Sequence, residues 1–207
     1  MKATEQRWTN LCTALGIPPD YSEFTHIKSA YSESHRAYHT VQHLSECLEK
    51  FDWAIVTENF PKAVLAEAAL WYHDVIYQQM AKDNEQISAE WAVRFLSQAG
   101  VGDEDCKLVS SLIMATCHVE DPQEATHQLV VDIDLSILGA ESTRFDEYER
   151  QVREEYKWIP WFVYKKKRRD LLKRFLDKPC IYATKMFHRE YEQQARENLK
   201  RSLAKLS

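Results

Sequence analysis

The segment from Ala63 to Trp71 constrains the fold of this chain most, because it is apolar on nearly every side. Glu67 alone interrupts it, and the pair His73-Asp74 follows directly behind it. A helix that is apolar all round lies at the centre of a helical protein. A carboxylate beside an imidazole at the end of such a helix is costly to bury unless a cation is present, and a metal ion is the usual cation. The sequence therefore predicts a central helix that ends at a metal site.

The composition predicts an all-α protein. The 207 residues include only four Gly and six Pro, and no two-residue hairpin turn such as Asn-Gly is evident. We expect one domain that covers residues 1–207, since nothing in the chain marks a linker. Apolar residues recur at helical spacing in the following stretches: Thr4–Leu15, Ser22–Ser32, His39–Phe51, Pro61–Val75, Asn84–Ala99, Glu104–Cys117, Leu129–Leu138, Thr143–Tyr156, Trp161–Leu176 and His188–Leu206.

The cysteines and the apolar runs indicate a cellular compartment. The five cysteines are odd in number and show no Cys-x-x-Cys spacing, which disfavours a disulfide framework and a zinc ribbon. The stretch from Met1 to Gly16 lacks the apolar core of a signal peptide, and no run reaches the roughly 18 apolar residues of a membrane span. We therefore expect a cytoplasmic protein with reduced thiols and no membrane partner.

Charge is unevenly distributed along the chain. Residues 150–207 contain 17 Lys and Arg against seven Asp and Glu, whereas residues 1–149 contain 10 against 25. A basic C-terminal third would attract a phosphorylated substrate toward an acidic, metal-holding body. The alternative is that the run Lys165–Arg169 is the solvated face of a helix. No nucleic-acid motif accompanies the basic third, so we do not expect nucleic acid as a partner.

Two other segments carry candidate metal ligands. His39 and His43 are four residues apart, so a helix from His39 would place both on one face. Asp132 and Asp134 interrupt the aliphatic run Leu129–Leu135, where an unpaired carboxylate would take up a proton. Both segments therefore favour a nearby cation.

Together these features resemble the HD superfamily of metal-dependent phosphohydrolases, whose signature is a histidine, a His-Asp pair and a distant aspartate. The chain is similar in more detail to a bacterial group of predicted phosphohydrolases of about this length. The similarity spans nearly the whole chain, in the stretches His35–His43, Trp71–Tyr77, Asp83–Ala89, Asp132–Gly139, Arg153–Tyr156 and Ala195–Asn198. The resemblance implies a single HD-type helical bundle.

The resemblance also implies a ligand set. Its first histidine corresponds to His43, its pair to His73 and Asp74, and its last aspartate to Asp134, with Asp132 as the competitor. Residues two apart point to nearly opposite sides of a helix, so only one of the two aspartates is expected to bind the metal. Imidazole and carboxylate ligands suit Mn, Fe, Co, Ni or Zn better than Ca or Mg.

Four other residues have a functional and a structural interpretation. His39 would bind the substrate or support the metal ligands without touching the metal, or it would be a further metal ligand. His118 would hold a second metal or a substrate phosphate, or be an ordinary loop histidine. Arg36 would clamp a phosphate, or form a surface salt bridge. Glu85 would act with Asp74 in proton transfer, or lie in the exposed first turn of a helix.

The leading functional hypothesis is a metal-dependent enzyme that hydrolyses a phosphate ester, either a nucleotide or a small phosphomonoester. Two alternatives remain open. Some proteins that resemble this superfamily hold two irons and use oxygen to cleave a carbon bond, and His39 and His118 would supply the extra ligands that such a centre needs. The other alternative is a nucleotide-binding module without turnover. The sequence also leaves open whether the chain forms a homo-oligomer.

Overall fold

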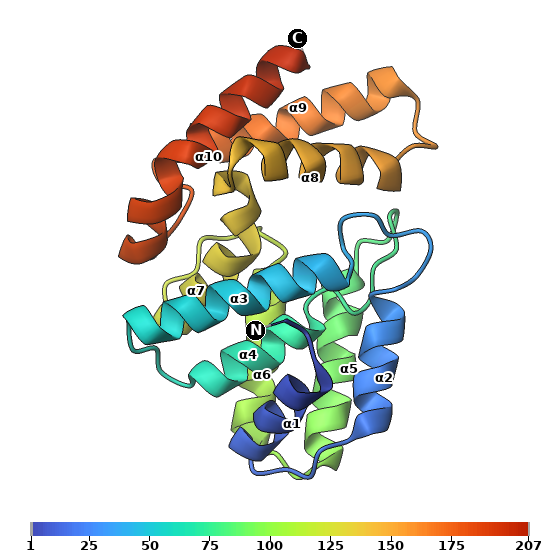
Figure 1. Cartoon of the computed structure of the whole chain (residues 1–207), viewed down its shortest axis with the longest axis vertical. Coiled ribbons are helices and arrows are strands. Elements are labelled where there is room, and N and C mark those ends of the chain that lie inside the picture. Colours follow the sequence, from blue (N-terminus) through green and yellow to red (C-terminus); the bar gives the residue numbers. More distant parts are fainter. Residues whose placement is uncertain (1, 207) are drawn as a thin grey trace.

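The computed structural model describes residues 2–206. In this part of the chain every regular element is a helix and no strand is present (Figure 1). The all-α prediction is confirmed. The elements are α1 (Glu5–Ala14), α2 (Tyr21–Ala30), α3 (Val41–Thr57), α4 (Ala63–Tyr72), α5 (Asn84–Gln98), α6 (Asp103–Ala115), α7 (Ala125–Asp134), the 3-10 helix η1 (Leu135–Gly139), α8 (Ser142–Glu155), α9 (Trp161–Asp177) and α10 (Lys185–Lys205).

Polar side chains at the helix starts define several of these boundaries. The side chains of Thr4, Asp20, Thr40 and Thr184 each accept a hydrogen bond from a backbone N–H in the first turn of α1, α2, α3 and α10, respectively. Such a cap satisfies one of the N–H groups that have no partner inside the helix, and it fixes the residue at which the helix begins.

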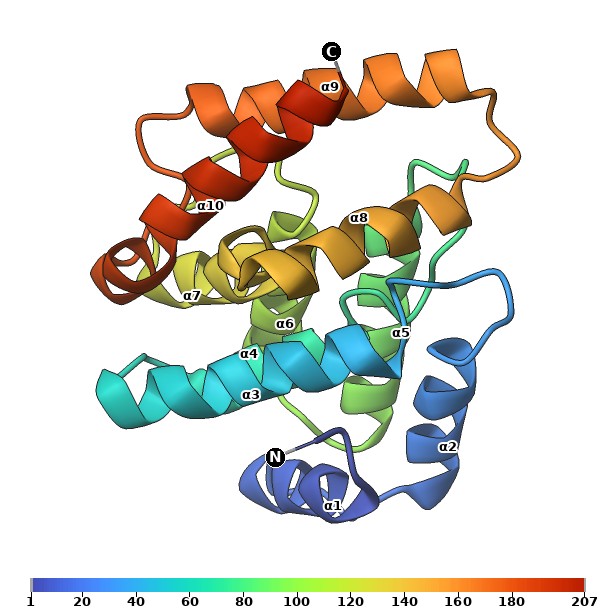
Figure 2. The ribbon, with the colours of Figure 1, turned by 45° about the horizontal axis from the view of Figure 1, so that its top comes forward.

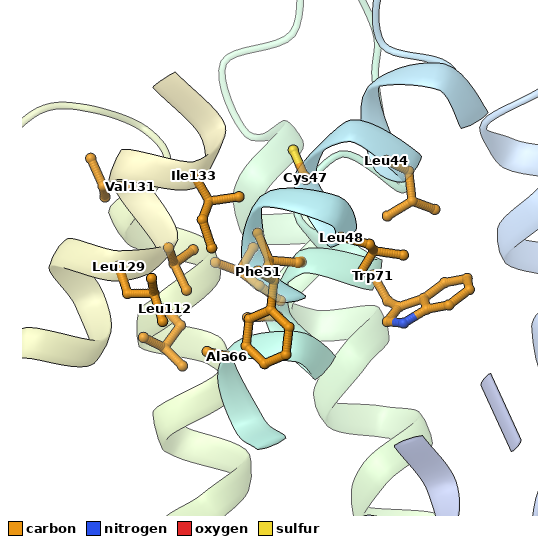
Figure 3. Close-up of a cluster of buried hydrophobic side chains, with 14 of the residues drawn as sticks. Leu44, Cys47, Leu48, Phe51, Ala66, Trp71, Leu112, Leu129, Val131 and Ile133 are labelled. Carbon is orange, nitrogen blue, oxygen red and sulfur yellow. The ribbon is translucent and has the colours of Figure 1, made fainter. Parts of the chain in front are cut away.

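Helix α4 lies at the centre of the fold, as its apolar sequence predicts. It packs against α1, α3, α5, α6 and α7. In Figure 3, Leu48 and Phe51 of α3 lie beside Ala66 and Trp71 of α4, with the side chains of α7 completing the cluster. These side chains are almost completely shielded from solvent.

The single charge within the apolar run of α4 is paired. Arg7 of α1, itself only 4% exposed, donates from Nε to Glu67 Oε1 at 2.7 Å and from its two terminal nitrogens to Asp52 at 2.7 and 2.8 Å. A buried carboxylate is tolerated when such a partner is present. Glu67 is therefore neutralised by Arg7 and not by a metal ion.

The C-terminal helices form a second layer above the α1–α7 body (Figures 1 and 2). Helix α10 packs on η1 and on α9, and α8 also packs on η1. Because η1 directly follows α7, the end of α7 lies at the junction of the two layers. This junction is where the candidate site is found.

Several predicted boundaries differ from the observed ones, and three of the differences have a clear local cause. Helix α3 begins at Val41 and not at His39, because Thr40 caps it. Helix α4 begins at Ala63, since Lys62 before it has a left-handed backbone with φ of 54°. The predicted helix Leu129–Leu138 is two elements, because α7 tightens into η1 after Asp134.

None of the helices formed by residues 2–206 combines the length and the apolar character that crossing a bilayer requires.

Candidate metal centre

Four predicted ligands from three distant segments meet at the centre of the molecule. His43 lies in the first turn of α3, His73 and Asp74 follow the end of α4, and Asp134 is the last residue of α7. The two histidines are 2% and 1% exposed. The packing of α3 and α7 on α4 therefore brings these side chains together.

The four ligand atoms are mutually close. His43 Nε2 lies 3.0 Å from His73 Nε2, and Asp74 Oδ2 lies 3.2 Å from both. Asp134 Oδ1 is 3.3 Å from His43 Nε2 and 3.7 Å from His73 Nε2. Atoms about 2.1 Å from a common ion are about 3.0–3.4 Å apart when they are neighbours in octahedral or tetrahedral coordination. Four of these five distances lie within that range, and the distance from Asp134 Oδ1 to His73 Nε2 is longer.

Hydrogen bonding fixes the orientation of His73. Its Nδ1 lies 2.9 Å from the carbonyl oxygen of Leu70, which can only accept, so Nδ1 carries the proton. The neutral ring then has a bare lone pair on Nε2, which faces Nε2 of His43. Metal-binding histidines are commonly oriented by such a backbone acceptor. Two ring nitrogens at 3.0 Å require a proton or a cation between them, so the pair fits a bound ion.

The charges in the cluster stabilise each other. Burial alone raises the pKa of a carboxyl group and lowers that of an imidazole. Here, however, His73 and the other imidazoles hold the pKa of Asp74 well below its usual value, and His118 and His43 lower that of Asp134. The surrounding groups in turn raise the pKa of His43 and His73 well above the ordinary value. Without an ion, protons on the imidazoles supply the positive charge that balances the two carboxylates. A bound divalent ion would replace these protons and supply that charge itself.

Cys47 is a member of the cluster that the sequence did not single out. It lies one turn after His43 on α3, and its ligand atom is within 4.8 Å of those of His43, His73 and Asp134. Its Sγ is 3.7 Å from both Nδ1 and Nε2 of His43, which places the sulfur beside the ring rather than along the Nε2 lone pair. Asp74 Oδ2, in contrast, is 3.2 Å from both Nε2 atoms. The geometry favours Asp74 as the fourth ligand and Cys47 as a wall of the site.

The two aspartates of α7 have different surroundings. Asp132 is fully buried and accepts hydrogen bonds from Ala183 N, Thr184 N and the Thr184 hydroxyl at 2.7–2.9 Å. Despite these donors, burial raises its pKa to about 6. Asp132 thus anchors the start of α10, whereas Asp134 faces the histidines.

His118 lies on the other side of Asp134. Its Nε2 is 3.0 Å from Asp134 Oδ2, while Asp134 Oδ1 faces His43 and His73. His118 also has φ of 53°, which is a strained backbone conformation for a residue other than glycine. Its Nδ1 is buried without a hydrogen-bond partner. The strain and the unpartnered nitrogen are typical of a residue held in place for function.

His39 precedes α3 and is oriented by a buried glutamate. Its Nδ1 lies 2.8 Å from Glu155 Oε2, and its ring stacks on Tyr77 with a centroid distance of 4.0 Å. Glu155 Oε1 accepts from the backbone N–H groups of Ala37, Tyr38 and His39 at 2.8–3.0 Å. These donors and His39 hold the pKa of Glu155 at about 2 although burial opposes ionisation. The ionised carboxylate accepts the proton of Nδ1 and so fixes the orientation of the His39 ring.

Arg36 does not have the geometry of the predicted phosphate clamp. Its guanidinium donates to the carbonyl oxygens of His39, Asp74 and Val75 at 2.6–3.1 Å and to the carboxylate of Glu33 at 3.0 Å. Its side chain is fully buried. Arg36 therefore uses its donors to fix the turn that contains Asp74, which is a structural role.

Glu85 is in the first turn of α5. Burial and the Glu85 carboxyl group raise the pKa of the Cys117 thiol, so Glu85 lies near the residue that precedes His118. Within residues 2–206, Glu85 forms no hydrogen bond or ion pair with the four ligands. Its role in proton transfer stays a prediction.

Two cavities adjoin the cluster. The aromatic cavity, of about 260 Å³, is lined by His39, Tyr77, His118, Tyr148 and Arg168 among others. The polar cavity, of about 150 Å³, includes His43, Cys47, Lys50, Ser136 and Arg144. Tyr38 and Asp134 line both cavities, so the cluster lies between them.

Sequence reasoning missed two charged residues of this region, Glu155 and Arg168. Arg168 is 6% exposed and donates from Nε to Glu149 at 3.1 Å, so it is not part of a solvated helix face. Each residue occupies a position in an apolar stripe. On α8 the stripe is Phe145, Tyr148, Val152 and Glu155, and on α9 it is Tyr164, Arg168, Leu172 and Phe175. A charge at helical spacing within such a stripe is the signal that could have identified both.

Comparison with known proteins adds no family to this description. No protein-family model matches the chain, and neither a curated protein nor a solved structure does.

Proposed function

We propose that this protein is a metal-dependent hydrolase of phosphate esters. The observation that supports the proposal most is the convergence of His43, His73, Asp74 and Asp134 beside a cavity that contains a buried arginine. The resemblance of the sequence to the HD superfamily points to the same chemistry. Mn, Fe, Co, Ni and Zn suit the mixed nitrogen and oxygen donors.

The side chains have separable roles in this proposal. A divalent ion held by the four ligands would lower the pKa of a coordinated water toward neutrality and so supply the nucleophile. Leu70 keeps Nε2 of His73 bare by accepting from Nδ1, and His118 orients the carboxylate of Asp134. His39 lines the aromatic cavity and would exchange a hydrogen bond with a hydroxyl group or water there. The guanidinium of Arg168 offsets negative charge on the phosphoryl oxygens.

The size of the aromatic cavity favours a small substrate. Drug-sized ligands occupy sites of roughly 300–1,000 Å³. A cavity of about 260 Å³ is below that range. We therefore infer a small phosphomonoester as substrate and not a whole nucleotide.

Hydrolysis of a panel of phosphomonoesters and nucleotides tests the proposal. The purified protein, stripped and then loaded with Mn²⁺, Co²⁺ or Ni²⁺, is expected to release phosphate from a small monoester. His73→Ala and Asp74→Ala should abolish release while circular dichroism shows that the helices persist. His127→Ala is the matched control, because His127 bonds to Ser111 away from the site. An active His73→Ala/Asp74→Ala double variant would disprove the proposal.

A second candidate is a centre with two irons that activates oxygen. The arrangement of Asp134 favours this alternative, since its Oδ1 faces His43 and its Oδ2 faces His118. A carboxylate with ligand atoms on both sides can bridge two ions. Two irons per chain and a coloured protein after aerobic purification would support the oxygenase, whereas a single Mn, Co or Ni would support the hydrolase.

A further inference from the structure

The hydroxyl group of Tyr38 is buried without a hydrogen-bond partner. Tyr38 is 4% exposed, and its oxygen is one of a few buried side-chain polar atoms of residues 2–206 that have no partner. Leaving a buried hydroxyl unsatisfied destabilises a protein, so most such groups are paired. An exception of this kind needs a physical explanation, and a ligand that completes the hydrogen bond is one.

The surroundings of Tyr38 indicate where that ligand would lie. The Tyr38 ring packs against His43, His39 and Tyr148, with centroid distances of 4.6–4.9 Å. Tyr38 also lines both cavities beside the cluster. Of the four proposed ligands, Asp134 alone lines both cavities as well. These contacts hold the ring at the wall between the cavities, next to two of the four metal ligands.

The chemistry of the neighbouring groups identifies the class of ligand. Arg168 lines the aromatic cavity, and its Nε and one terminal nitrogen donate to Glu149. The cluster beside the cavity could hold a metal ion, and an ion there together with the guanidinium would favour an anion. A tyrosine hydroxyl is a donor to an anionic oxygen, and such a charge-assisted hydrogen bond is stronger than a neutral one.

We propose that Tyr38 donates a hydrogen bond to a phosphoryl oxygen of the substrate held beside the metal centre. This inference rests on the proposed function and adds a substrate-binding residue to it. It explains why this buried position has a tyrosine, since phenylalanine would fill the same space without burying an unpaired hydroxyl group.

Tyr38→Phe tests the inference with two measurements that do not depend on turnover. In the metal-free protein, the variant should unfold at the same temperature as the wild type or at a higher one, because it removes an unpaired buried hydroxyl. In the Mn²⁺-loaded protein, calorimetry should show unchanged Mn²⁺ affinity and an affinity for inorganic phosphate that is about 10–100-fold weaker.

Tyr72→Phe is the matched control. The Tyr72 hydroxyl donates to Glu23 Oε1 at 2.8 Å, away from the cluster. Its removal should lower the unfolding temperature and leave phosphate affinity unchanged. The control thus separates the loss of a satisfied hydroxyl from the loss of a ligand contact.

The outcomes distinguish this inference from the proposed function. If Tyr38→Phe binds phosphate as tightly as the wild type, or if it is less stable without metal, the inference is wrong and the proposed function stands. If the wild type binds none of Mn²⁺, Co²⁺ and Ni²⁺, both are wrong. If it binds one of these ions and hydrolyses a monoester but does not bind phosphate, only the inference about Tyr38 is wrong.

Discussion

Individual residues of the site are oriented by groups outside the ligand cluster. The carbonyl of Leu70 accepts from Nδ1 of His73, so Nε2 is the nitrogen that faces the cluster, and the carboxylate of Glu155 fixes the ring of His39. The backbone N–H groups that bind Glu155 belong to the segment that carries His39 itself. Glu155 thus joins α8 to the loop before α3.

Glu155→Gln should reduce stability in a pH-dependent way. The pKa of Glu155 is lowered from 4.5 to about 2 in the folded protein, so its ionised form stabilises the fold above pH 4.5. This contribution, about 3 kcal/mol, is lost as the pH falls toward 2. The variant should therefore be less stable at pH 7. The gap in free energy of unfolding between the wild type and the variant should be smaller than at pH 7 by about 1 kcal/mol at pH 4 and by about 2 kcal/mol at pH 3.

Urea unfolding of both proteins at these pH values measures the gap. The carboxylates of Asp74 and Asp134 also titrate in acid, but they are present in both proteins and cancel in the difference. A gap that stays constant between pH 7 and pH 3 would show that Glu155 is not held as the ionised form.

The sequence predicts the residues of the cluster better than it predicts those around it. His73, Asp74 and Asp134 are evident because each places a polar group within or beside an apolar run. Glu155 and His39 are 116 residues apart, so their contact depends on how α8 crosses the body. The buried role of Arg36 also depends on tertiary contacts, since its acceptors are carbonyls of the turn after α4.

At the scale of helices, the junction of η1 with α10 requires a residue without a side chain. A Cβ atom at Gly139 would lie 2.6 Å from Tyr191 Cβ and 2.7 Å from the Tyr191 carbonyl oxygen. Both distances are shorter than a van der Waals contact, and one neighbour is backbone. The close approach of α10, and not an unusual backbone angle, explains the glycine.

Gly139→Ala should destabilise the protein by about 1–3 kcal/mol, because α10 must move to accommodate the methyl group. Gly102→Ala is the control, since nothing lies within 4 Å of a Cβ there. The free energy of unfolding of Gly102→Ala should differ from that of the wild type by no more than about 0.5 kcal/mol. Urea unfolding compares the three proteins. Equal stability of Gly139→Ala and the wild type would mean that α10 does not pack as described.

Helix periodicity identifies nearly all elements, but caps decide where they begin. The apolar pattern of α3 continues backward to His39, and only the side chain of Thr40 ends it. For this reason His39 and His43 do not share a helical face as predicted. They are instead brought near each other by the loop that Glu155 holds, with ring centroids 5.9 Å apart.

At the scale of the whole molecule, the candidate site lies where the two layers meet. The α1–α7 body supplies all four ligands, whereas α8 and α9 supply Tyr148 and Arg168 to the aromatic cavity. The basic C-terminal third therefore contributes the buried Arg168, paired with Glu149, next to a cluster that could hold a metal ion. Composition predicts the helical class and the charge asymmetry, but the way in which α9 reaches the cavity is determined by packing of the complete chain.

Binding of one divalent ion by His43, His73, Asp74 and Asp134 underlies the proposed function. Anomalous X-ray scattering from crystals grown with Co²⁺ would locate such an ion. We expect a single strong anomalous peak about 2.0–2.2 Å from Nε2 of both histidines and from a carboxylate oxygen of both aspartates. Absence of a peak there, with the imidazoles and carboxylates bonded only to one another at a Co²⁺ concentration that labels other sites, would contradict it.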